Sequence, residues 1–103
     1  MRRLIAMVVV VSAFATACGA SSEGKFGAEL FEVSCARCHG NGGEGSVGPP
    51  IGTPDANAAL NLSDDQITGV IRVGPGAMPG HPGLSDEQVA SLVVFIRSLQ
   101  AGG

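Results

Sequence analysis

Basic residues are scarce in this 103-residue chain, which has six Lys and Arg against nine Asp and Glu. Two of the six, Arg2 and Arg3, stand at the very start, so the rest of the chain carries four basic residues, nine acidic ones and a net charge of −5. Binding to DNA or RNA depends on Lys and Arg that neutralise phosphates. The composition therefore argues against nucleic acid as a partner.

Long hydrophobic runs are also absent. The longest apolar stretch, Leu4–Phe14, is interrupted by Ser12 and is far shorter than the about 20 residues that a helix needs to span a bilayer. It follows two arginines and precedes the small residues Ala15–Ala17, which is the pattern of a cleaved export signal. We predict that residues 1–17 are a signal peptide, which places the protein on the extracytoplasmic or periplasmic side of a bacterial cell envelope.

Cysteine is rare too, and one of the three cysteines, Cys18, directly follows the small residues of the signal. This arrangement is similar to the lipobox of bacterial lipoproteins, in which the cysteine is lipidated and becomes the first residue. The alternative is an ordinary signal-peptidase cut after Ala17, which would leave an exposed thiol without a partner. Lipidation explains Cys18 better, so we expect lipid attachment there, residues 18–25 as a tether to the membrane, and a domain over residues 26–101.

The other two cysteines form the run Cys35-Ala36-Arg37-Cys38-His39. C-x-x-C-H is the attachment signature of haem c: each thiol adds to a porphyrin vinyl group, and the histidine becomes the proximal iron ligand. A zinc site would need two further ligands, for which the chain offers only Cys18 and His81. A thioredoxin-like dithiol would need a strand that leads into the motif. We therefore predict one covalently bound haem c, which leaves no thiol for a disulfide.

Apolar spacing and turn residues predict an all-α domain with long loops. Phe26, Leu30 and Val33 lie at helical intervals, with Phe31 adjacent, and predict a helix that ends at Cys35. The stretch 40–61 is rich in Gly, Pro and Asn and predicts an irregular loop over one haem edge.

Two capping boxes predict the remaining helices. Ser63 is followed by Gln66, and Ser85 by Gln88, each with two acidic residues in the first turn, where the helix dipole favours them. The first of these helices should end at Gly74 and the second at about Gln100. The second has a predicted buried stripe widened by Phe95: Val89, Leu92, Val93, Ile96 and Leu99.

Methionine is nearly absent once the signal is removed, because only Met78 remains. Met often fills gaps in a core, but this one lies in a loop of four glycines and three prolines, residues 74–83. A thioether is a soft ligand that stabilises ferrous iron more than a second imidazole does. We predict Met78 as the distal ligand, with His81 as the competitor.

The stretch from Phe26 to Leu99 resembles the small class I mono-haem cytochromes c, and also the haem-c domains of terminal oxidase complexes. The motifs that carry the resemblance are Cys35–His39 with Gly27 and Phe31 upstream, Gly48–Ile51, Met78-Pro79, and Leu92–Ile96. The resemblance implies the class I cytochrome c fold, with three or more helices and long loops around one haem.

The resemblance also implies two contacts. The first and last helices should cross closely, with a small residue against an aromatic one, among Gly27, Phe31, Leu92 and Phe95. The carbonyl of Pro49 should accept a hydrogen bond from the proximal imidazole of His39. Trp and Tyr are absent, so the propionate contacts that some relatives make with those side chains are unavailable.

Electron transfer is the function that these residues predict. With both axial positions of the iron filled, no small-molecule substrate binds and the protein is not an enzyme; its partners should be redox proteins of a respiratory or other envelope chain. The alternative is a haem-c subunit of an envelope oxidase or dehydrogenase complex. A gas sensor or peroxidase with an open distal site would not need Met78 on a rigid loop, and a purely structural lipoprotein leaves the haem motif unexplained.

Overall fold

The computed structural model describes residues 21–102, apart from the side chain of Ala58, so the predicted signal (1–17) and Cys18 lie outside the described residues. Five helices follow one another in this part: α1 (Gly27–Ser34), α2 (Ala36–His39), α3 (Asn57–Leu60), α4 (Asp64–Val73) and α5 (Asp86–Gln100). Residues 21–102 contain no strand, and the predicted all-α fold is confirmed. None of the described helices is long and apolar enough to cross a membrane.

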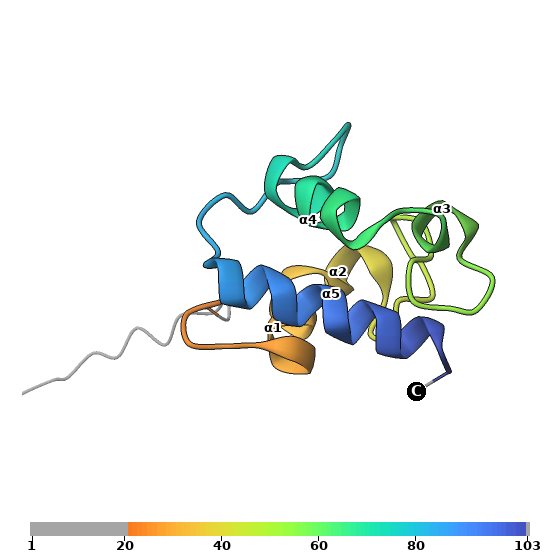
Figure 1. Ribbon diagram of the computed structural model, residues 1–103, viewed down its shortest axis with the longest axis horizontal. Coiled ribbons are helices and arrows are strands. Elements are labelled where there is room, and N and C mark those ends of the chain that lie inside the picture. The colour runs from red at the N-terminus through yellow and green to blue at the C-terminus, as the bar shows by residue number, and fades with distance from the viewer. Residues whose placement is uncertain (1–20, 103) are drawn as a thin grey trace, which may run out of the picture.

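The longest helix, α5, runs through the middle of the domain, with α1 on one side of it and α4 on the other (Figure 1). Its buried stripe faces both neighbours and completes the core. The largest fully buried side chains come from α1 and α5: Leu30, Phe31, Val89 and Leu92. The Phe31 and Phe95 rings contact each other with centroids 5.2 Å apart, which fixes how α1 crosses α5.

The two predicted capping boxes are both present. The Ser63 hydroxyl accepts a hydrogen bond from Gln66 N at 3.1 Å, and Ser63 N donates to Gln66 Oε1 at 2.8 Å. Ser85 and Gln88 make the same pair of bonds at 3.0 Å each. Because these bonds satisfy orphan backbone donors locally, α4 and α5 begin where the sequence predicts.

The first helix differs from its prediction in two respects. Phe26 is the N-cap residue and is half exposed, so it is not part of the buried stripe. Gly27 has φ +54, a left-handed conformation that favours glycine, and a Cβ placed on it would meet nothing within 4 Å. The expectation that Gly27 permits a close helix crossing is therefore wrong; its backbone conformation explains it, and its N–H donates to Ser91 Oγ at 2.9 Å.

The loop predicted for residues 40–61 contains a short helix, α3, which the abundance of Gly, Pro and Asn did not indicate. Arg97 of α5 donates to the Ala59 carbonyl at 3.3 Å and to the Leu62 carbonyl, and it pairs with Asp64 at 3.0 Å. Gln100 donates to the Ile51 carbonyl at 2.8 Å. The end of α5, which is distant in the sequence, thus holds residues 51–64 in place. Local composition does not reveal such contacts.

Candidate functional site

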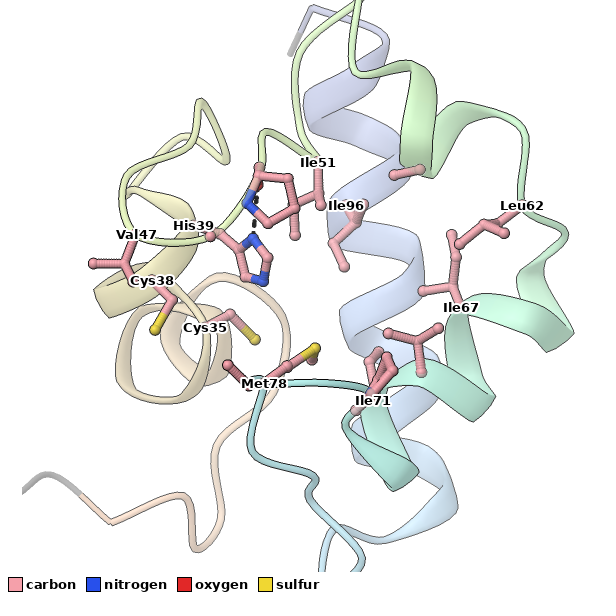
Figure 2. Close-up of a pocket in the computed structure, with 16 residues that line it drawn as sticks. Cys35, Cys38, His39, Val47, Ile51, Leu62, Ile67, Ile71, Met78 and Ile96 are labelled. Atoms are coloured by element: carbon pink, nitrogen blue, oxygen red, sulfur yellow. Dashed lines mark hydrogen bonds between the residues drawn. The ribbon is translucent and has the colours of Figure 1, made fainter.

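A cavity of about 400 Å³ lies between the Cys35–His39 segment, α4, α5 and the 74–83 loop (Figure 2). Its size falls within the roughly 300–1,000 Å³ typical of ligand and cofactor pockets. Most of its wall is apolar, and the labelled aliphatic residues are Val47, Ile51, Leu62, Ile67, Ile71 and Ile96. The cavity therefore suits a large, flat, mainly apolar ligand.

Cys35 and Cys38 both line this cavity as free thiols. The turn between α1 and α2 places them there, because Cys35 separates the two helices and Cys38 lies in α2. Burial, and then the neighbouring Cys38, raises the pKa of the Cys35 thiol to about 11.

His39, at the end of α2, is buried and its ring projects into the cavity (Figure 2). Its Nδ1 lies 2.8 Å from the Pro49 carbonyl oxygen. A carbonyl can only accept, so Nδ1 carries the hydrogen, and the lone pair of Nε2 is left for a metal. The contact that the resemblance implied for Pro49 is present.

Gly48 allows the chain to pass close to the histidine ring. A Cβ at this position would lie 3.0 Å from His39 Cε1, tighter than ordinary contact. The Gly48 N–H also donates to the Cys38 carbonyl at 2.6 Å. The turn that delivers the Pro49 carbonyl is thus fastened directly to the motif, a role of Gly48 that sequence reasoning had left unassigned.

Met78 reaches the cavity from the loop that follows α4 (Figure 2). Two glycines shape this loop. Gly74 ends α4 with φ +69, and a Cβ on it would collide with Gly80 N and the Met78 carbonyl. A Cβ on Gly80 would lie 2.6 Å from the carbonyl oxygens of Arg72 and Val73. Close backbone packing on α4, together with Pro75 and Pro79 on either side of Met78, therefore holds the thioether in place.

His81 is placed differently, because it is not among the residues that line the cavity. Its backbone N–H donates to the Ile71 carbonyl at 2.8 Å, which ties the loop to α4. Within residues 21–102 no three His, Cys, Asp or Glu side chains gather as a metal site. The cavity instead collects two thiols, one imidazole and one thioether inside apolar walls, a donor set that fits a haem attached through cysteines and ligated by His and Met.

Comparisons with known proteins match most of the chain to cytochromes. A family model described as cytochrome C oxidase, cbb3-type, subunit III, matches residues 22–96. Cytochrome c6 of Bryopsis maxima is 36% identical over 77 residues, covering 70% of this chain and 86% of that protein. Cytochrome c6 of Leptolyngbya boryana is 32% identical over 74 residues, covering 68% of this chain and 85% of that protein.

Proposed function

Since the chain belongs to the cytochrome c family, as a small mono-haem electron-transfer protein with one covalently bound haem c, we propose which of its residues hold that haem and where it works. Cys35 and Cys38 attach the porphyrin, while His39 and Met78 ligate the iron. The observation that carries this assignment is that all four side chains line one apolar cavity. The bound haem supplies one-electron chemistry by alternating between ferric and ferrous iron.

The proximal side of the proposed site orients the imidazole. The Pro49 carbonyl accepts the hydrogen bond from His39 Nδ1, with nitrogen and oxygen 2.8 Å apart, so the ring keeps one tautomer and one orientation. Such a bond also raises the basicity of the ligating nitrogen. Because the orientation is set before any change of iron charge, little rearrangement is needed when an electron enters or leaves.

The distal side supports Met78 over His81. Met78 lines the cavity, and the packing of Gly74 and Gly80 on α4 restrains the loop that carries it. His81 does not line the cavity, and its backbone N–H bonds the same loop to the Ile71 carbonyl of α4. A thioether ligand favours ferrous iron and gives a higher potential than a second imidazole, so we propose a His/Met carrier rather than a bis-histidine one.

A protein with both axial positions filled has no open coordination site for a substrate. We therefore propose a carrier that is not itself an enzyme. The domain over residues 26–101 would pass single electrons between redox proteins of the bacterial envelope, after removal of the signal at 1–17. No small molecule or nucleic acid is needed as a partner.

A second candidate is a haem-c subunit of an envelope oxidase or dehydrogenase complex. The description of the family model that matches residues 22–96, which names a subunit of an oxidase, favours it. Native electrophoresis of envelope membranes in mild detergent separates the two. A free carrier migrates as a small red band, whereas a subunit migrates with a large complex and is lost from it only on denaturation.

The proposed location depends on Cys18, the predicted lipid-attachment residue. Two or three acyl chains give stable membrane anchoring, whereas one is marginal. The protein should therefore fractionate with membranes, and Cys18→Ala should release it to the soluble fraction or leave it unprocessed. A free Cys18 thiol, or a mature chain that begins at Gly19, would contradict the anchor.

The proposed haem attachment is tested with protein from the native envelope. Its intact mass should equal the polypeptide plus one haem and the acyl groups, and its visible spectrum should be that of low-spin haem c. Extraction with acidified acetone should leave the colour on the polypeptide, because thioether bonds survive this treatment. Release of free haem into the solvent would overturn the assignment of Cys35 and Cys38.

A further inference from the structure

A second hollow, shallow and open, lies on the outer side of α1 and α5. We name it the α1–α5 groove, and its wall includes Phe26, Ala90, Ser91, Val94, Phe95 and Ser98. Phe26 is 50% exposed and Val94 is 69% exposed, which are high values for large apolar side chains. No charged residue lines the groove: Glu87 lies one turn ahead of Ala90, and Arg97, next to Ser98, pairs with Asp64 of α4.

The groove and the haem cavity lie on different sides of α5. Ile96 lines the cavity, whereas Val94 and Ser98 line the groove. Each of these two residues is two positions from Ile96, about 200° around the helix at roughly 100° per residue. A surface that covers the groove therefore leaves the cavity and its Met78 loop uncovered.

The segment that leads into the domain is fastened beside the groove. Gln88 is buried at the start of α5, and its Nε2 donates to the carbonyls of Ser22 at 2.9 Å and Lys25 at 3.0 Å. A turn closed by Lys25 N and the Ser22 carbonyl at 3.1 Å, with Gly24 at φ +70, shapes the segment. In Figure 1 it lies, in orange, next to the beginning of α5. Residues 22–25 are thus part of the folded domain.

This clamp shortens the tether. Only Gly19, Ala20 and Ser21 separate Cys18 from Ser22, and the four steps of chain span at most about 14 Å. If Cys18 carries lipid, the start of α5 and the adjacent Phe26 are held at the membrane surface. The rest of the domain can turn about this point but cannot move away from it.

Charge then selects the face that turns toward the lipid. The chain after the signal has a net charge of −5, and a charged side chain is costly to withdraw from water into a lipid surface. On the opposite side of α5, the first turn of α4 exposes Asp64 and Asp65. The groove next to the clamp can approach the lipid without withdrawing a charged side chain of its own lining from water.

We propose that the α1–α5 groove rests on the lipid surface of the membrane that holds the anchor, so that the haem cavity is turned away from the lipid. This inference rests on the lipidation proposed for Cys18. The groove places Phe26 and Val94 at headgroup level, where apolar side chains of surface-bound segments lie. The exposed orientation of the cavity leaves it open to redox partners that approach from the aqueous side.

The test measures how accessible single introduced thiols are. Val94→Cys lies in the groove, and Val73→Cys, at the end of α4, is the matched control because Val73 is 76% exposed. Each acylated holoprotein is added to preformed phosphatidylcholine vesicles and treated with a charged, membrane-impermeant maleimide. The reference is the same variant in a soluble Cys18→Ala background. The native cysteines carry lipid or haem under the proposed function, so the introduced thiol is the one that reacts.

Labelling of Val94→Cys should slow by roughly ten-fold on vesicles, since a face held at headgroup level is withdrawn from water. Labelling of Val73→Cys should change by less than about two-fold, because α4 stays in the aqueous phase. Equal rates for Val94→Cys on and off vesicles, or protection of Val73→Cys instead, would overturn the orientation alone. An intact mass without acyl groups on Cys18, in protein that does not float with vesicles, would overturn the anchor and this inference with it.

Discussion

The proximal loop (residues 40–52) and the distal loop (residues 74–84) flank the same cavity, but they are held by different means. In the proximal loop, Gly45 N and Gly48 N donate at 2.6 Å to the carbonyls of His39 and Cys38, so the loop is bonded directly to the motif. In the distal loop, His81 N donates to the Ile71 carbonyl at 2.8 Å and Met78 N to the Pro75 carbonyl at 3.1 Å, so no bond reaches the Cys35–His39 motif, and Gly74 and Gly80 pack closely where the loop meets α4. The loop beside His39 is bonded directly to the Cys35–His39 motif, whereas the loop that carries Met78 is bonded and packed only against itself and α4.

This difference predicts which ligand is lost first under stress. His39, the proposed proximal ligand, directly follows Cys38, a proposed attachment residue, and has its own hydrogen bond to Pro49. Met78, the proposed distal ligand, lies in a loop that packs closely on α4 through Gly74 and Gly80, and a misfit of one methyl group is enough to disturb such packing. We therefore expect damage to the distal loop to open the iron while the haem stays attached.

The largest effect should come from removing the proposed covalent link to the haem, on which both sides of the site depend. Cys35→Ala together with Cys38→Ala removes both thioethers, so the chain should be colourless and largely unfolded, because a domain of this size depends on its haem as a staple. The visible spectrum and far-ultraviolet circular dichroism check this. A double variant that keeps its helices without haem would show that packing alone stabilises the domain.

Gly80→Ala should break the distal side alone. The added Cβ would lie 2.6 Å from two backbone carbonyl oxygens of α4, so the loop must shift, at a cost of about 1–3 kcal/mol of unfolding free energy. The haem should remain attached, and the ferrous protein should bind carbon monoxide. Gly83→Ala is the control, because a Cβ there meets nothing within 4 Å. Carbon monoxide binding by the control, or none by Gly80→Ala, would contradict the steric account.

Gly48→Ala makes the corresponding change on the proximal side and should destabilise the protein less than Gly80→Ala does. Its Cβ would lie 3.0 Å from His39 Cε1, so the ring must give by a few tenths of an ångström while the hydrogen bond to Pro49 persists. We expect a loss of about 1 kcal/mol in unfolding free energy and no carbon monoxide binding. Denaturant titration measures the unfolding free energy, and the spectrum of the ferrous protein under carbon monoxide shows whether the gas binds. Carbon monoxide binding by Gly48→Ala would contradict the predicted difference between the two loops.

The smallest effect should come from the ion pair at the end of the distal loop. Arg72 donates to the Leu84 carbonyl at 3.0 Å and to Asp86 at 2.6 Å, and the Asp86 side chain is 97% exposed. Arg72→Ala should cost about 1 kcal/mol, mainly from the bond to Leu84. Asp86→Asn should cost less than about 0.5 kcal/mol, because exposed pairs are screened. Thermal unfolding measures both losses of stability. Equal losses for Arg72→Ala and Asp86→Asn would contradict this ranking and assign the effect to the ion pair.

Local signals predicted the parts of this fold that local chemistry determines. The boxes at Ser63 and Ser85 placed α4 and α5 because their bonds join residues three apart. The motif at Cys35 and the isolated Met78 indicated two parts of the cavity lining. They could be found in the sequence because a thiol or a thioether keeps its chemistry in any fold. The structure brings these residues to one cavity, as the resemblance implied.

What the sequence did not reveal depends on distant parts of the chain. Arg97 supports the stretch that contains α3, and it lies more than thirty positions away. The packing of Gly80 on α4 and the clamp of Gln88 on Ser22 are likewise contacts across the fold. The resemblance assigned Gly27 to a close helix crossing, whereas the structure explains it by a positive φ. A backbone dihedral angle of this kind cannot be read from the pattern of residues. Such contacts become visible only when the helices are placed in space.

The ligand state of Met78→Ala, compared with His81→Ala, tests the central claim most directly. In the wild-type protein the ferric spectrum should contain the near-red charge-transfer band of sulfur-ligated haem, and the ferrous form should not bind carbon monoxide. Met78→Ala should lose the band and bind carbon monoxide, while His81→Ala, which keeps the backbone bond to Ile71, should match the wild type. A low-spin spectrum that survives in Met78→Ala and disappears in His81→Ala would contradict the account and assign the iron to two histidines.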